Sequence, residues 1–129
     1  MSNTPENVLE RWMENVNKLE VESIAGLYDD ESILLPTFSP HRISKPIQVK
    51  EYFSQLSTRK NMRVELHSGT LRKSELGESR YIMTGIYSFH FVEDGANLTF
   101  PSRFTFILDV SKEKPIIHHH SSQIPRTLS

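Results

Sequence analysis

The stretch "SRYIMTGIYSFHFVEDGANLTFPSRFTFILDV", residues 79–110, decides the fold. Polar and apolar residues alternate along both of its halves, and Asp94 and Gly95 lie between them. Such alternation is typical of strands with one buried face, and an Asp-Gly pair favours a tight hairpin turn. The stretch therefore predicts two long antiparallel strands, 79–95 and 97–110, joined at this turn.

Helical patterns precede the hairpin, and shorter strands flank it. The full set of expected elements is helices at 5–19, 21–28 and 45–56 and strands at 32–36, 63–67 and 116–125. Helices gathered on one face of an antiparallel sheet make an α+β domain. We expect a cone, in which a curved antiparallel sheet carries the N-terminal helices on its concave side and encloses a pocket.

Composition places the chain among folded, single-domain proteins. Its 129 residues suit one domain (1–129) with a core at about 5–125. A net charge of -1 gives no electrostatic reason to expect nucleic acid or an anionic membrane as partner. The lack of cysteine excludes disulfides, thiolate metal sites and cysteine nucleophiles. Because the sequence shows no signal peptide and no apolar run of ~20 residues, the expected location is the cytoplasm.

The last expected strand carries the most distinctive motif, "KPIIHHHSSQIP". Because side chains alternate along a strand, His118 and His120 share a face with Ser122, while His119 and Ser121 point the other way. Three consecutive histidines therefore cannot form a three-histidine zinc site by themselves. The residues alone leave three interpretations open: a structural network of imidazoles and hydroxyls, a metal-free active site, or a metal site completed from elsewhere.

A resemblance narrows these interpretations. "HHHSSQIP" after an apolar strand, "LYDDESILLPTFS" and "GIYSFHF … SRFTFIL" together resemble the family built on the association domain of calcium/calmodulin-dependent protein kinase II, from about Leu9 to Pro125. Among stand-alone members the chain is most similar to the iota-class carbonic anhydrases. The resemblance implies an NTF2-like cone and the hydration of carbon dioxide to bicarbonate. It favours no cofactor, although manganese or zinc assists some relatives.

The resemblance also implies a set of catalytic residues. The family's pocket uses hydroxyls from a threonine, a tyrosine and a serine, with a histidine close by. Thr37 in "LLPT" and Tyr52 in "EYF" match the first two. For the others we prefer His120 with Ser122 over the pair on the opposite face, because His118 would extend the same polar surface. The histidine would take a proton from the attacking water.

Four further side chains are expected to contact substrate: Arg103, His118, Ser121 and Tyr87. Arg103 would hold bicarbonate if it points into the cone, and would be a solvated charge if it points outward. Core packing is the first role expected for Tyr87, and pocket lining is the second.

Other functions remain open at this point. The resemblance also allows a non-catalytic association or small-ligand-binding module. An isomerase of the ketosteroid type would need an inward carboxylate in an apolar cavity, but Glu65 is expected to point outward, and Glu93 and Asp109 lie at strand ends. The open sheet face of the family implies a homodimer.

Overall fold

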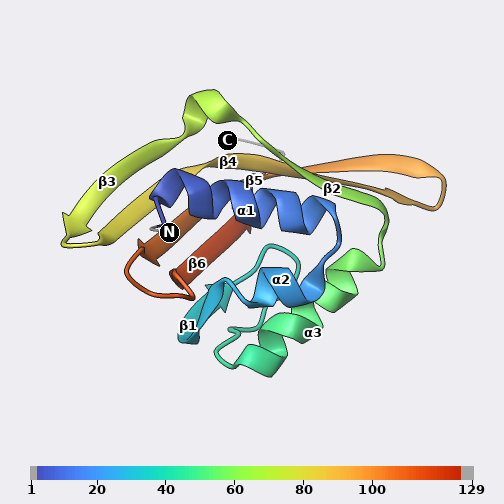
Figure 1. Cartoon of the computed structure of the whole chain (residues 1–129). Helices are drawn as coiled ribbons and strands as arrows, with labels where there is room; N and C mark the ends of the chain where they lie inside the picture. The colour runs from blue at the N-terminus through green and yellow to red at the C-terminus, as the bar shows by residue number, and fades with distance from the viewer. Residues whose placement is uncertain (1–2, 126–129) are drawn as a thin grey trace.

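The computed structural model describes residues 3–125, and it confirms the expected α+β class with helices on one side of a curved sheet (Figure 1). The helices are α1 (Pro5–Asn17), α2 (Val21–Ala25) and α3 (Pro46–Ser57), with a short 3-10 turn η1 (Ser68–Thr70). The strands are β1 (Tyr28–Leu35), β2 (Lys60–Leu66), β3 (Arg72–Gly77), β4 (Arg80–Glu93), β5 (Ala96–Asp109) and β6 (Ile116–Gln123). In Figure 1, α1 lies across the sheet, while α2 and α3 pack against each other near β1.

The sheet is mixed rather than wholly antiparallel, which corrects the expected topology. Its strands are ordered β1-β6-β5-β4-β2, and β3 pairs with β4 off this path. β4 and β5 pair without a break from Arg80 opposite Asp109 to Glu93 opposite Ala96, which confirms the hairpin predicted at residues 79–110. β1 runs parallel to β6. These two strands lie far apart in the sequence, so no local signal fixes their relative direction.

Two elements differ from the sequence prediction. Tyr28 begins β1 instead of ending the second helix, because α2 ends at Ala25 and Gly26 follows it. Every residue of β3 is exposed, so this strand lacks the alternation by which a half-buried strand is recognised.

The first helix forms as its sequence pattern predicts. The Thr4 hydroxyl accepts a hydrogen bond from the backbone N–H of Asn7 at 3.1 Å, and Pro5 occupies the first helical turn. Val8 and Trp12 lie on the buried face of this helix. No helix within residues 3–125 is long and apolar enough to cross a membrane.

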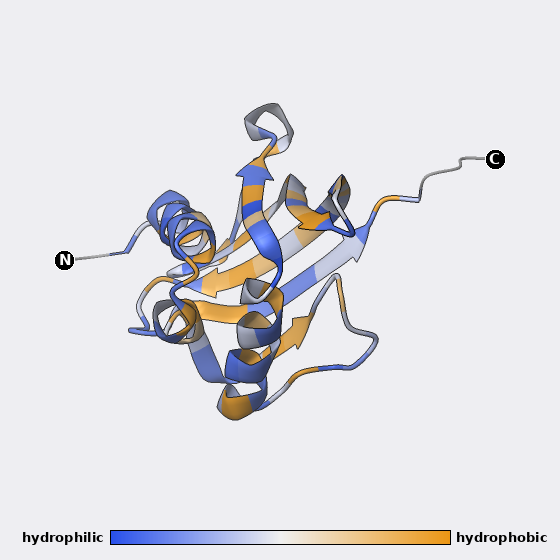
Figure 2. Cartoon of the chain, turned by 90° about the vertical axis from the view of Figure 1, so that its right-hand side faces the viewer, coloured by the Kyte–Doolittle hydropathy of each residue, from blue (hydrophilic) through white to orange (hydrophobic). Residues whose placement is uncertain are grey.

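An aromatic core fills the space between α1 and the sheet. Trp12 stacks on Tyr87, with ring centroids 5.5 Å apart, and meets the Phe106 ring edge-on at 5.5 Å. Phe53 of α3 packs edge-on against the same indole at 6.4 Å. Figure 2 shows hydrophobic colour along the strands that the helices cover, and hydrophilic colour over much of the helices. This core makes the inward face of β6 a dry environment.

Candidate functional site

The inward-facing polar pair of β6 is His119 with Ser121, which corrects the preferred choice of His120 with Ser122. His119 and Ser121 are 2% and 4% exposed, whereas His120 is exposed to solvent. The Phe106 ring stacks on the His119 ring with centroids 3.9 Å apart. The imidazole that faces the core is therefore His119.

A β-bulge explains the reversal. Ile116 pairs with Leu108, and both are buried, but the next pair along the strands is His118 with Ile107. Ile117 is thus an extra residue in β6. Without it, every second residue after Ile116, which includes His118 and His120, would face the interior. One inserted residue turns the other set of side chains inward.

His119 is hydrogen-bonded at both ring nitrogens. Its Nδ1 lies 2.7 Å from the hydroxyl of Tyr28, and its Nε2 lies 3.0 Å from the hydroxyl of Tyr87. The indole N–H of Trp12 donates to the Tyr28 hydroxyl at 2.9 Å. The imidazole is therefore held between two buried phenols, with no ring nitrogen left over.

The chain of hydrogen bonds continues through three more hydroxyls. Tyr87 donates to Ser121 Oγ at 2.7 Å, and Ser121 shares a short hydrogen bond with Thr37 Oγ1. Thr37 Oγ1 donates to Ser102 Oγ at 3.5 Å, and Ser102 Oγ donates to the backbone carbonyl of Phe100 at 3.4 Å. Thr37, Tyr87 and Ser121 thus belong to one connected polar site inside the aromatic core.

Burial sets the charge state of this site. Desolvation holds the pKa of His119 well below its usual value, and the neighbouring His118 and His120 lower it further. Desolvation raises the pKa of Tyr28 and of Tyr87. At neutral pH the imidazole is therefore neutral and the phenols keep their protons, so the site presents hydroxyl groups rather than charges.

These side chains line a small, deep cavity. Its volume is about 10 Å³, and its wall is made by Trp12, Leu34, Pro36, Thr37, Tyr52, Phe53, Tyr87, Phe89, His119 and Ser121. A space of this size holds about one water molecule. The cavity therefore combines an apolar shell with a few hydroxyl-bearing side chains in its wall.

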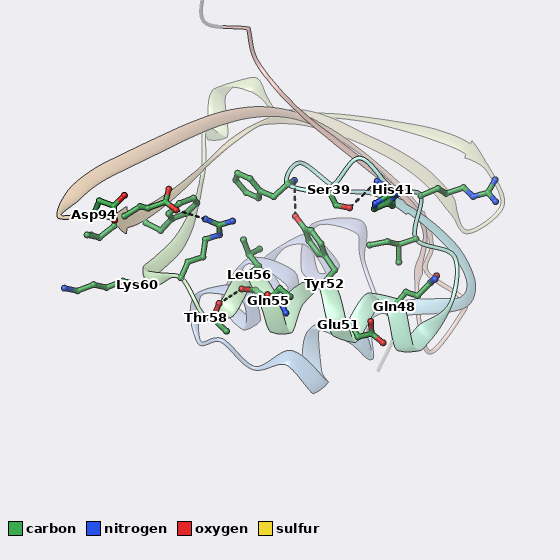
Figure 3. Close-up of a pocket in the computed structure, with 17 residues that line it drawn as sticks. Ser39, His41, Gln48, Glu51, Tyr52, Gln55, Leu56, Thr58, Lys60 and Asp94 are labelled. Atoms are coloured by element: carbon green, nitrogen blue, oxygen red, sulfur yellow. Dashed lines mark hydrogen bonds and ion pairs between the residues drawn. The ribbon is translucent and has the colours of Figure 1, made fainter.

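A second, larger cavity of about 830 Å³ opens between α3, the segment 38–43 and the turn of the β4–β5 hairpin (Figure 3). Tyr52 lines both cavities and is the wall between them. Figure 3 shows its hydroxyl directed at the backbone N–H of Phe38, which donates to it at 3.4 Å. The Arg59 guanidinium lies 4.6 Å from the ring centroid of Phe91 in the same cavity. Desolvation raises the pKa of Tyr52, so this wall also presents a neutral hydroxyl.

Four of the expected site residues lie on the outer face of the sheet, away from both cavities. Arg103 is exposed and pairs with Ser122 of β6, and His120 pairs with Thr105. His118 lies on the same face and is partly exposed. The inward alternative for Arg103 is therefore wrong, because strand alternation turns its side chain to solvent. By contrast, the other four expected residues, Thr37, Tyr52, Tyr87 and Ser121, line the deep cavity together.

Sequence reasoning missed two members of the site. Tyr28 lies within the quoted "LYDDESILLPTFS", but its helical spacing from Ile24 hid its place in a strand. Ser102 was missed although a signal exists: it is a polar residue at an inward position between Phe100 and Phe104, and it is fully buried. A small hydroxyl residue inside an aromatic stripe indicates a buried polar partner.

The donor set of the deep cavity does not fit a manganese or zinc ion. Both metals need several imidazole, carboxylate or thiolate ligands. Here the single imidazole already uses both nitrogens, and the remaining polar groups are neutral hydroxyls. Among residues 3–125, no group of three or more histidines and carboxylates is placed to hold a metal.

Solved structures with the same architecture identify the class of fold. A Xanthomonas campestris protein provisionally described as a calcium/calmodulin-dependent protein kinase II association domain superposes with a TM-score of 0.83 at 23% identity, covering 95% of this chain and 86% of that one. An uncharacterised Caulobacter vibrioides protein with a cystatin-like fold superposes with a TM-score of 0.77 at 14% identity, covering 94% and 87%. At such identities the likeness shows the cystatin-like, or NTF2-like, fold alone.

The sequence itself gives the family. The profile of the calcium/calmodulin-dependent protein kinase II association domain matches residues 5–125, so the chain belongs to this family. No curated protein matches it.

Proposed function

We propose that the chain is a carbonic anhydrase that hydrates carbon dioxide reversibly to bicarbonate in the deep cavity, without a metal. One observation carries the proposal: Thr37, Tyr87, His119 and Ser121 form a connected hydroxyl–imidazole site beside a cavity with room for about one water. Carbon dioxide is small and apolar, and the aromatic wall suits it. The hydroxyls suit a nucleophilic water.

The reaction joins a water oxygen to carbon, moves one C=O electron pair onto oxygen and releases one proton. Ser121 would orient the water by accepting one of its O–H groups, and Thr37, whose contact to Ser102 is long at 3.5 Å, would turn its O–H to the oxygen that gains charge. Tyr52 accepts from the Phe38 amide, which leaves its own O–H able to donate from the facing wall. Because His119 has both nitrogens engaged, it acts on the site through Tyr87, and the released proton passes to water on the Tyr52 side.

The closed cavity is too small for water and carbon dioxide together. Substrate entry therefore requires movement of Tyr52, the wall shared with the larger outer cavity. In this proposal the outer cavity of about 830 Å³ is the route from solvent, and it receives the bicarbonate product.

The test is stopped-flow hydration of carbon dioxide with a pH indicator, on protein treated with a chelator and checked for residual metal. We expect turnover above the buffer rate that survives the chelator. Thr37→Val should lower kcat/KM on the order of 100-fold, the usual value of a positioned hydrogen-bond donor. Thr105→Val on the outer face is the matched control and should leave the rate unchanged. Equal rates in the two variants, or no turnover in the wild type, would refute the proposal.

The second candidate function is self-association through the outer sheet face. Ile82, Ile107, His118 and Ile33 lie side by side across β4, β5, β6 and β1, and Ile33 is 37% exposed. Three isoleucines in one row with His118 are unusual on a solvated face and favour a partner. A homodimer formed by two copies of this face is consistent with membership of an association-domain family.

Light scattering after gel filtration tests the homodimer. We expect the wild type to have the mass of two chains and Ile107→Glu to have the mass of one, because a charge buried at the centre of the row has no partner. Ile47→Glu is the control, since Ile47 is 60% exposed on α3, away from the row. A monomeric wild type, or an Ile107→Glu dimer, contradicts the inference. A dimer without turnover would leave association as the function.

A further inference from the structure

We propose that Tyr28 is a positioning residue that fixes the proton of His119 on Nε2 and thereby turns the hydroxyl of Tyr87 toward Ser121. The consequence for catalysis rests on the proposed carbonic anhydrase function. The proton position itself is a property of the folded chain and can be measured without any substrate.

The two ends of the buried hydrogen-bond chain can each take only one role. At one end the Trp12 indole N–H can only donate, and it lies 2.9 Å from the Tyr28 hydroxyl. At the other end the Phe100 carbonyl can only accept, and Ser102 Oγ lies 3.4 Å from it. Every group between them carries one proton to donate. Because the first group can only donate and the last can only accept, each group between them donates toward the Phe100 end of the chain.

The direction can be followed from the Trp12 end. Because Trp12 donates to the Tyr28 oxygen, the Tyr28 O–H turns to its one acceptor within residues 3–125, which is Nδ1 of His119 at 2.7 Å. A neutral imidazole that accepts at Nδ1 carries its proton on Nε2. That N–H donates to the Tyr87 oxygen at 3.0 Å, which leaves the Tyr87 O–H for Ser121 at 2.7 Å.

The opposite tautomer is penalised mainly at Tyr28. A proton on Nδ1 would bring a second donor to the Tyr28 oxygen, beside the Trp12 indole, and would leave the Tyr28 O–H buried without an acceptor. Nε2 would then accept from Tyr87 and draw its hydroxyl away from Ser121. The other end of the chain is a weaker constraint, because its contacts at Thr37–Ser102 and Ser102–Phe100 are long.

Packing keeps the imidazole in the orientation that places Nδ1 at Tyr28 and Nε2 at Tyr87. The ring stacks on Phe106 at 3.9 Å with an interplanar angle of 16°, and the Trp12 indole meets it edge-on at 5.4 Å. A ring flip that exchanges carbon for nitrogen at these positions would break both hydrogen bonds. The burial that lowers the pKa of His119 also keeps the ring neutral, so one proton has to be placed.

The experiment is nitrogen-15 NMR of the histidine rings, which distinguishes the two tautomers by the shifts of Nδ1 and Nε2. In the wild type at neutral pH, we expect His119 to be almost wholly Nε2–H with a hydrogen-bonded Nδ1. Tyr28→Phe should move the Nδ1 resonance to that of a free ring nitrogen and populate the second tautomer. Trp12→Phe leaves the Tyr28 donor in place and should keep the Nε2–H form. Tyr81→Phe is the matched control, because Tyr81 lines neither cavity and its ring lies under the Lys73 ammonium at 5.8 Å.

Kinetics provide the second readout. In Tyr28→Phe we expect kcat for carbon dioxide hydration to fall roughly tenfold, which corresponds to about 1.4 kcal/mol, with KM unchanged. A wild-type His119 found as Nδ1–H, or a Tyr28→Phe spectrum identical to the wild type, overturns the positioning role even if the enzyme is active. If Tyr28→Phe does not fold, the tautomer of His119 in the wild-type spectrum alone tests the proposal. Absence of turnover with the Nε2–H tautomer present overturns the proposed function and leaves the proton position standing.

Discussion

Ser121→Ala is expected to lower kcat/KM for carbon dioxide hydration at least about 100-fold, whereas Ser122→Ala leaves it unchanged. Ser121 is 4% exposed, accepts the Tyr87 hydroxyl at 2.7 Å and bonds Thr37. Its removal breaks the hydroxyl chain at the cavity and leaves a buried donor of Tyr87 unpaired, which costs about 1–3 kcal/mol of stability. Ser122 lies on the outer face opposite Arg103 and contacts none of these groups.

The two adjacent serines make a stringent comparison. Both are in β6, both lose the same atom, and they differ in the face they occupy. Initial rates by stopped flow give the effect on turnover, and circular dichroism with a thermal melt shows whether Ser121→Ala is folded at the assay temperature. Loss of turnover in Ser122→Ala with none in Ser121→Ala would place the chemistry on the outer face and remove the deep cavity from consideration.

The long hairpin was predictable because its information is local. Alternation on both sides of Asp94 and Gly95 defines β4, β5 and their register. The same local reading placed Tyr87 among core aromatics, and it is fully buried there. The resemblance contributed Thr37 and Tyr52, which the structure brings to one cavity.

The sequence could not predict which set of alternating side chains in β6 faces the core. A single extra residue, Ile117, reverses which histidine faces the core, and isoleucine is common at regular and bulged positions alike. The parallel pairing of β1 with β6 is likewise set by the whole fold. It brings Tyr28 opposite Ile116, next to the strand that carries the imidazole. Neither the bulge nor the parallel pairing can be recognised from a short window of residues.

The site does not use its histidine as the proton acceptor expected from the sequence, because both ring nitrogens of His119 are hydrogen-bonded. His118 and His120 lie on the outer face of the sheet, and the histidine that reaches the site is the one that burial keeps neutral. A neutral ring with both nitrogens engaged orders its neighbours better than it accepts protons. The chemistry of the cavity therefore depends on hydroxyl groups, and the imidazole sets the direction in which they donate.

This burial has a second measurable consequence, in acid. The folded-state pKa of His119 is well below its usual value, whereas in the unfolded chain it is about 6.5. Below about pH 6.5 the unfolded state thus binds a proton at His119 that the folded state does not bind. Stability is fully present above about pH 6.5 and is lost as the pH falls below it, with a slope that approaches 1.4 kcal/mol per pH unit for this one residue, on the order of 2.303RT.

Urea unfolding between pH 7.5 and about pH 5 measures this slope, above the range in which most carboxylates titrate. We expect His119→Gln to be less stable than the wild type at pH 7.5, because it loses the bonds to Tyr28 and Tyr87, but to have a flatter dependence on pH. His118→Gln is the comparison. Desolvation also lowers the pKa of His118, but its ring is partly exposed, so solvent makes its contribution to the pH dependence of stability smaller. If the free energy of unfolding depends on pH in the same way in the wild type and in His119→Gln, protonation of the buried imidazole does not cause the loss of stability in acid. The assignment of His119 as a neutral imidazole hydrogen-bonded at both nitrogens would then be wrong.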